Sequence, residues 1–174
     1  MAQGSQKRIT KELSELTSSP PAGITVSLAD ESDLLKWKVT MEGPADSPYA
    51  GGTFHLLLTL PPQYPFRPPT LTFTTKVYHP NISSGPTTAN PANTPGITTP
   101  APAEAGVMCL GILKPEEWKP STKIAAVLGF ARQLLREPNP DDAVEGRIAE
   151  ELRRDRAAWE KEARDWTKRY AMKK

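Results

Sequence analysis

The chain has 174 residues, with 22 lysines and arginines against 20 aspartates and glutamates, which leaves a formal net charge of +2 at pH 7. This length is typical of one domain, and a core of that size needs no disulfide or metal to hold it together. Because the charge is nearly balanced, it gives no argument for nucleic acid or an anionic membrane as the main partner. With Cys109 as the single cysteine and only two histidines, the composition excludes an internal disulfide and a structural metal site.

The chain shows none of the usual targeting segments. Its first twenty residues lack the apolar run of a secretory signal, and no stretch approaches the roughly 18 apolar residues of a membrane helix. The last four residues, AMKK, carry no prenylation cysteine. We therefore expect a soluble protein of the cytoplasm or the nucleus, where Cys109 stays a thiol.

Hydrophobic periodicity predicts one helix followed by four strands in the first half of the chain. Ile9, Leu13 and Leu16 recur at helical spacing within residues 7–16, and this helix must end before Pro20. Apolar and polar residues then alternate, or form short apolar runs, over 24–28, 35–41, 53–60 and 70–74. Short turn-rich gaps between these runs predict an antiparallel meander.

The second half of the chain reads as helical. Apolar residues at helical spacing predict a helix over 124–135 that stops at Pro138. A similar pattern continues over 144–170, and Asp155 stands where the chain bends between two helices. A helix, four strands and three further helices make an α+β fold, which we expect to form one domain over residues 1–174.

Prolines concentrate in one segment between these halves. From Ile82 to Gly106 the chain consists almost wholly of Ser, Thr, Ala, Pro, Gly and Asn, with Glu104 as its only charge. Such a composition offers too little apolar surface to offset the entropy lost on ordering. We therefore predict a mobile insertion over 82–106 within the domain.

Cys109 and the motif Tyr78-His79-Pro80-Asn81 are the candidates for chemistry. A lone cysteine with apolar residues on both sides is more often a small buried hydrophobe than a nucleophile. The motif by itself is most simply a proline turn in which the asparagine bonds its own backbone. The predicted sheet, however, places the two on the same side, where the fourth strand ends, and together they favour a functional site.

Several motifs resemble the ubiquitin-conjugating enzymes, in order along residues 7–172. They are KRI at 7–9 with KEL at 11–13, GPADSPYAGGTF, YPFRPP, KVYHPNI, CLGIL, Trp118 followed by Pro120, EPNPDD and the helix over 163–171. Within the family, the chain is most similar to the compact class that consists of little more than the catalytic domain. It differs by the Pro/Thr-rich insertion, because relatives pass from the asparagine to the cysteine in about eight residues.

The resemblance implies the ubiquitin-conjugating fold and a role for each residue of the site. Cys109 would carry ubiquitin as a thioester and pass it to a substrate lysine or a ligase cysteine. Asn81 would brace the neighbouring loop and donate to the oxyanion, while His79 and Pro80 would hold the turn. Asp142 would orient the incoming lysine. No bound cofactor and no metal are implied, since ATP is used by the upstream activating enzyme.

The resemblance also implies partners. These are ubiquitin, the activating enzyme, RING, U-box and HECT ligases and substrate proteins, with the protein itself a monomer. The residues implied for binding ligases and the activating enzyme are Lys7, Arg8, Phe66, Pro120 and Ser121. Tyr78 would either pack against the active-site loop or belong to the core.

Some departures from the family pattern leave alternatives open. Gly111 stands where many relatives carry an acidic residue, and Asp141 or Asp142 would serve equally well as helix N-caps. A non-catalytic variant that binds ubiquitin as a scaffold, or an enzyme for another ubiquitin-like modifier, are the rival functions. Such non-catalytic variants lack the cysteine, so the presence of Cys109 favours an enzyme.

Overall fold

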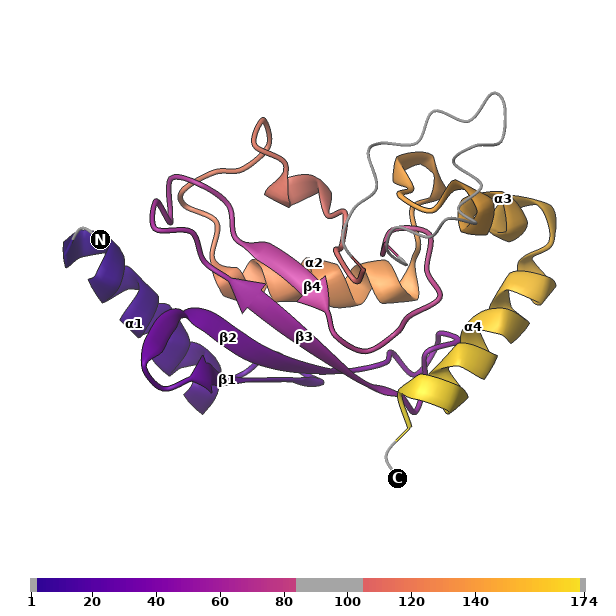
Figure 1. Cartoon of the computed structure of the whole chain (residues 1–174), viewed down its shortest axis with the longest axis horizontal. Coiled ribbons are helices and arrows are strands. Elements are labelled where there is room, and N and C mark those ends of the chain that lie inside the picture. The colour runs from indigo at the N-terminus through magenta and orange to yellow at the C-terminus, as the bar shows by residue number, and fades with distance from the viewer. Residues whose placement is uncertain (1–2, 84–104, 173–174) are drawn as a thin grey trace.

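The computed structural model describes residues 3–83 and 105–172, and it has the α+β order predicted from the periodicity (Figure 1). The elements are α1 (Gln3–Ser18), β1 (Ile24–Asp30), β2 (Asp33–Glu42), β3 (Thr53–Thr59), β4 (Thr70–Phe73), the 3₁₀ helix η2 (Gly111–Leu113), α2 (Ile124–Arg136), the 3₁₀ helix η3 (Pro140–Asp142), α3 (Gly146–Arg154) and α4 (Arg156–Tyr170). Among the described residues, no helix is both long and apolar enough to cross a bilayer.

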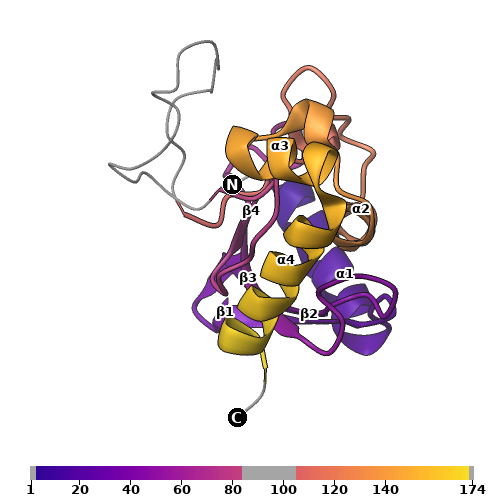
Figure 2. The same cartoon turned by 90° about the vertical axis from the view of Figure 1, so that its right-hand side faces the viewer.

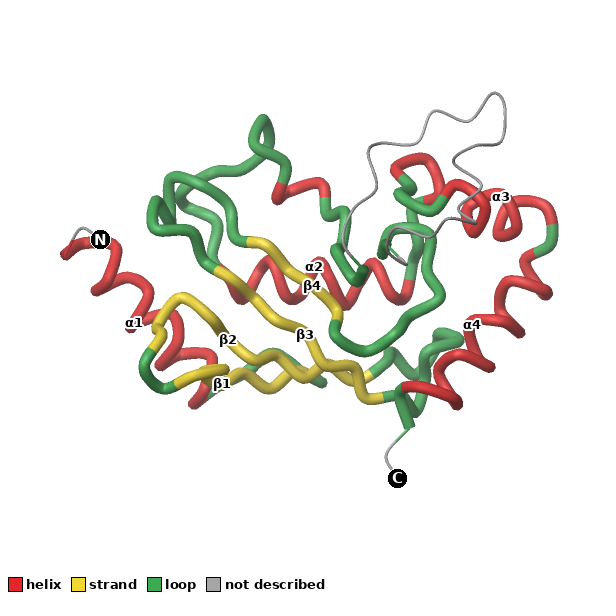
Figure 3. Tube along the Cα trace, viewed as in Figure 1, coloured by secondary structure: helices red, strands yellow, loops and turns green. Residues whose placement is uncertain are grey.

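The four strands form an antiparallel meander in the order β1-β2-β3-β4, as predicted. Alternation puts one face of the sheet in the core, where Val39 of β2 lies between Val26 and Leu56 of its neighbours. Helix α2 crosses behind the sheet in Figure 3. Its Ile124, Val127, Leu128, Ala131 and Leu135 are buried at helical spacing and join the same core.

The last two helices leave the sheet at one end of the molecule, where α4 runs down toward the end of the chain (Figure 2). Asp155 separates them, as the sequence predicts, and its carboxylate accepts a hydrogen bond from the Ala158 N–H at 3.1 Å. The backbone N–H of Thr53, at the start of β3, donates to the Ala171 carbonyl at 2.8 Å. This bond ties the end of α4 to the sheet.

The boundaries expected for the mobile insertion are wrong at both ends. Ile82 is buried and forms an isolated bridge with Met108, and Gly106 accepts a hydrogen bond from the Phe73 N–H at 2.7 Å. Gly106 has a φ of +85°, and a Cβ there would lie 1.9 Å from the Phe73 oxygen, so the close approach requires glycine. Ile82 and Gly106 therefore belong to the packed frame, while residues 84–104 of the predicted insertion lie outside the described residues.

Candidate active site

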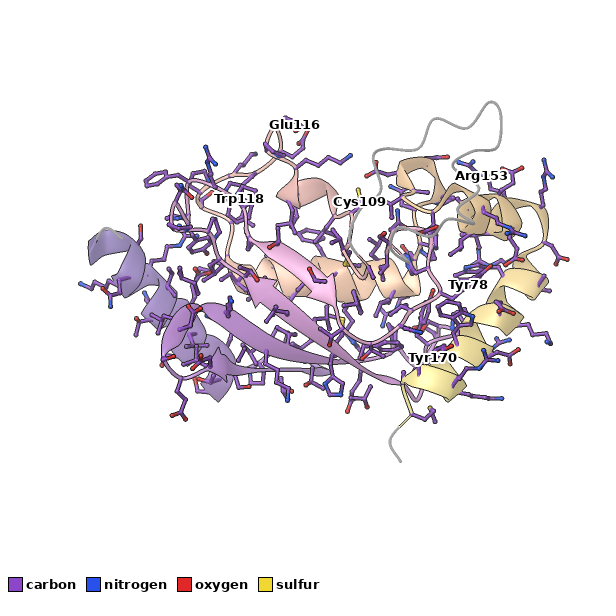
Figure 4. All side chains as sticks on the ribbon, in the orientation of Figure 1. Tyr78, Cys109, Glu116, Trp118, Arg153 and Tyr170 are labelled. Atoms are coloured by element: carbon purple, nitrogen blue, oxygen red, sulfur yellow. The ribbon has the colours of Figure 1, made fainter. Side chains whose placement is uncertain are left out.

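Cys109 lies on a segment that continues the sheet beyond β4. Val107 bridges Thr72 of β4, and the Met108 N–H donates to the Leu71 carbonyl at 3.2 Å. The side chains of Met108 and Leu110 on either side are buried, whereas the free thiol of Cys109 is partly exposed (Figure 4). The simple interpretation of Cys109 as a buried hydrophobe is therefore wrong, because alternation along this segment turns its neighbours inward and Cys109 outward.

A carboxylate from a distant part of the chain stands beside the thiol. Asp142, the last residue of η3, places Oδ2 at 3.9 Å from the Cys109 Sγ. Its other oxygen, Oδ1, lies 3.0 Å from the Nζ of Lys114. Lys114 was not among the residues predicted from the sequence. It follows Cys109 by five residues, and the single turn of η2 between them brings it back toward the site.

The charges around Cys109 oppose one another. Burial raises the pKa of the Cys109 thiol above its usual value, and the Asp142 carboxylate raises it further, while the Lys114 ammonium lowers it. The hydrogen bond and charge of Asp142 in turn raise the pKa of Lys114. Neutral thiol and charged lysine are therefore the resting forms at pH 7. A carboxylate in this place disfavours a thiolate and favours a cation beside it.

Asn81 connects the cysteine segment to the loop that carries Asp142. Asn81 is 1% exposed, and its side-chain amide nitrogen donates to the carbonyls of Asn139 and Asp142 at 2.8 and 3.0 Å. Its side-chain oxygen accepts from the Asn139 N–H at 2.9 Å, and its backbone carbonyl accepts from the Cys109 N–H at 2.9 Å. This geometry supports a brace. Both amide hydrogens are engaged, so an oxyanion would have to displace one of those carbonyls.

His79 and Pro80 hold the turn beneath the site. The buried His79 ring accepts from the Asn81 N–H through Nδ1 at 2.9 Å and contacts the Leu134 carbonyl through Nε2 at 2.7 Å, which requires the proton on Nε2. Burial lowers the pKa of His79 to about 4, so the ring is neutral. The Pro80 carbonyl accepts from the N–H groups of Val144 and Glu145 at 2.9 and 3.0 Å.

Tyr78 takes the second of the two places expected for it, packed against the core, whereas Asp141 does not cap a helix. The Tyr78 hydroxyl donates to Glu151 at 2.7 Å, and its ring packs on Trp166 at 5.3 Å, so it faces α3 and α4, away from Cys109 (Figure 4). Asp141 pairs with Arg153. Neither Asp141 nor Asp142 caps a helix, because both lie inside η3 and the position before α3 belongs to another residue.

The residues implied for ligase binding lie together at the other end of the sheet. Phe66 is 75% exposed, and Lys7, Pro120 and Ser121 are also exposed. The loop that carries Phe66 and the loop that carries Pro120 are joined by a hydrogen bond from the Trp118 indole to the Pro65 carbonyl at 2.7 Å.

Arg8 differs from these exposed neighbours because its guanidinium is turned inward. It donates to the carbonyls of Pro120 and Thr122, the latter at 2.9 Å, and lies over the Tyr64 ring at 5.3 Å. Arg8 therefore supports this surface from beneath.

Two further observations concern what the site can hold. Within residues 3–83 and 105–172, no three His, Cys, Asp or Glu side chains are grouped so as to hold a metal ion. At Gly111, in η2, an added Cβ would meet nothing within 4 Å. A β-carbon at this position would therefore displace no described atom.

Comparisons with known proteins identify the family of this chain. A family model described as ubiquitin-conjugating enzyme matches residues 8–88 and 94–167. Ubiquitin-conjugating enzyme E2 14 of Schizosaccharomyces pombe is 44% identical over 167 residues, which cover 96% of this chain and 94% of that protein. The chain therefore belongs to the ubiquitin-conjugating enzymes, a family of transferases.

Proposed function

We propose that this enzyme accepts ubiquitin on Cys109 as a thioester and transfers it to a substrate lysine or a ligase cysteine. The observation that carries the proposal is the partly exposed thiol of Cys109, with the Asp142 carboxylate 3.9 Å from its sulfur. Membership of the ubiquitin-conjugating family supplies the modifier, the activating enzyme and the ligases as partners in general.

The loading step is an exchange of thioesters. The Cys109 sulfur, as thiolate, attacks the carbonyl carbon of ubiquitin's terminal glycine on the activating enzyme. A new carbon–sulfur bond forms, the old one breaks, and the activating enzyme's cysteine leaves as thiolate. ATP is spent upstream, so Cys109 needs no base of its own beyond modest help with its proton.

The transfer step uses the other residues of the site. An amine that approaches Cys109 meets Asp142, whose carboxylate orients it, while Asn81 holds the loop that carries this carboxylate. The carbon–nitrogen bond forms as the carbon–sulfur bond breaks. The partly exposed position of Cys109 leaves room for both a lysine and a ligase cysteine.

The ligase surface is proposed at the loops of Phe66 and of Pro120–Ser121, with Lys7 beside them. An aromatic side chain that is 75% exposed is a plausible anchor for a RING or U-box domain. We further propose that the enzyme works in the cytoplasm or nucleus, because a reducing compartment keeps Cys109 as a thiol. We also propose that it works as a monomer.

A charging assay with activating enzyme, ATP and ubiquitin tests this function. Wild type should form a conjugate that reducing agent removes, Cys109→Ser an ester that resists reduction, and Cys109→Ala no conjugate. A thioester on the Cys109→Ala protein would contradict the assignment. Parallel reactions with other ubiquitin-like modifiers test the rival function of an enzyme that conjugates a different modifier. Absence of charging with every modifier would favour the non-catalytic scaffold.

A further inference from the structure

The carboxylate of Asp142 is shared between two groups of the active site. One oxygen faces the Cys109 sulfur at 3.9 Å, and the other holds the Lys114 ammonium at 3.0 Å. The side chains of Lys114 and Asp142 are each 38% exposed, so an incoming amine can reach them from solvent. The carboxylate that would receive an acceptor lysine therefore already has a resident cation.

Few other charges influence this pair. The titratable groups that interact with Lys114 among the described residues are Asp142, Cys109 and Glu116. Asp141, next to Asp142, is paired with Arg153, and His79 beneath the site is neutral. Lys114 thus supplies the positive charge that balances Asp142 beside the sulfur.

A lone carboxylate would bind an acceptor lysine well but would slow its reaction. A free lysine has a pKa near 10.4 and arrives as an ammonium, which has no lone pair with which to attack. An uncompensated carboxylate stabilises that ammonium, whereas a neighbouring positive charge destabilises it. Lys114 therefore has two opposite effects on an acceptor, because it weakens binding and favours the reactive amine.

We propose that Lys114 is a positioning residue that balances the charge of Asp142, so that Asp142 orients the acceptor lysine without holding it as an unreactive ammonium. This inference rests on the proposed function. In the step concerned, the acceptor ammonium gives one proton to solvent. Its nitrogen then bonds the thioester carbon, the carbon–sulfur bond breaks, and the proton shed by the nitrogen converts the departing Cys109 thiolate to thiol.

The test is transfer from the preformed ubiquitin thioester to free lysine, without ligase, over a range of pH and lysine concentration. Lys114→Met should lower the KM for lysine and lower the maximal rate at pH 7, each by about two- to fivefold, as expected for a partly exposed ion pair. The difference in rate should shrink as the pH rises past the acceptor's pKa of about 10.4, because the acceptor then becomes neutral in both proteins. Reactions without lysine correct for hydrolysis.

Two variants serve as controls. Lys114→Arg keeps the charge and should retain the wild-type pH profile. Lys119→Met removes an exposed lysine five residues further along and should change neither KM nor rate. A wild type that takes up no ubiquitin overturns the proposed function and the inference with it. Normal charging combined with a defect of equal size at every pH, or with no defect, overturns the inference alone.

Discussion

The Asp142 carboxylate acts in opposite directions on the two steps proposed for Cys109. It raises the pKa of the thiol and so disfavours the attacking thiolate, but it attracts the lysine that later attacks the thioester. The partly exposed position limits both effects, since solvent screens charges there. The proposed acceptor site therefore lies beside a proposed nucleophile whose reactivity the same carboxylate lowers.

Replacing Asp142 by asparagine should separate these effects. Because Asp142 raises the pKa of Cys109, its removal lowers that pKa, and alkylation by iodoacetamide at pH 7 should become about two- to fivefold faster. Transfer to free lysine should fall by about ten- to a hundredfold, since the acceptor is no longer oriented. Asp141→Asn, beside it but paired with Arg153, is the matched control and should change neither rate. Slower alkylation of Asp142→Asn would contradict the assigned sign.

Asn81→Ala should affect transfer more than loading. The substitution leaves the Asn139 N–H and two carbonyls without their partner, at a cost of about 2–4 kcal/mol in the free energy of unfolding. Thioester formation should stay near wild type, while discharge to lysine slows, because the Asp142 loop loses its support. Asn139→Ala is the control, since only the backbone of Asn139 makes these bonds. Equal discharge rates at matched amounts of thioester would show that Asn81 is only a turn residue.

At the scale of elements, α1 supports the loops of the proposed ligase surface. Arg8 bonds the carbonyls of Pro120 and Thr122, and one turn later Glu12 accepts from the Ile124 N–H, the first of α2, at 2.9 Å. The hydroxyl of the buried Tyr64 donates to the same Glu12 carboxylate. A buried carboxylate is thereby satisfied by groups from two segments outside α1, which fixes α1 against both loops.

Arg8→Ala should therefore lower stability as well as ligase response. Loss of its bonds to two loop carbonyls should cost about 1–3 kcal/mol in the free energy of unfolding measured in urea. Ligase-stimulated discharge should fall because the Pro120 loop is no longer held. Phe66→Ala is the comparison: its exposed side chain can be removed with a change of about 0.5 kcal/mol or less, yet the ligase response should also fall. An Arg8→Ala protein as stable as wild type would mean that the guanidinium does not support the loops and serves only to bind partner proteins.

At the scale of the whole molecule, residues 78–81 join most of its parts. Tyr78 reaches Glu151 in α3, His79 the Leu134 carbonyl in α2, and Asn81 the loop of Asp142. The resemblance marks this motif for its place beside Cys109, but three of its residues also connect the sheet side to the C-terminal helices. Changes here are therefore changes to the stability of the whole fold.

His79 should make that stability depend on pH. Its pKa is lowered to about 4 in the fold, chiefly by burial, against about 6.5 in the unfolded chain. The unfolded state therefore binds a proton first, and the stability contributed by the neutral ring is complete above pH 6.5 and lost as the pH falls toward 4. Between pH 7 and pH 5 the loss should be about 2 kcal/mol, as measured by urea unfolding.

Two glutamine variants check this assignment. His79→Gln should be less stable at pH 7 but should show a shallower fall between pH 7 and pH 5. His55→Gln removes the exposed histidine of β3 and should keep the wild-type slope. An unchanged slope in His79→Gln would show that other groups cause the pH dependence.

The sequence by itself determined the order of elements and the family. Helical and alternating periods are local, so Ile9 with Leu13, or the break at Asp155, can be found without knowing what packs against them. The ends of the segment 82–106 were misjudged for the same reason. Gly106 looks like the rest of that segment in composition, and Ile82 alone sets up no hydrophobic period. Only their pairing with Phe73 and Met108 shows that they belong to the frame.

Only the tertiary structure decided how the side chains are shared between partners. Arg8 is a cation near a proposed binding surface in the sequence, and it becomes a support because the loop carbonyls lie within its reach. Lys114 belongs to none of the sequence motifs. Its proposed role arises because η2 and η3 bring one oxygen of Asp142 to Lys114 and the other to Cys109. Interactions between residues far apart in the chain depend on distances of a few ångströms, since hydrogen bonds weaken steeply with distance and solvent screens charges that lie further apart. Local patterns do not encode those distances.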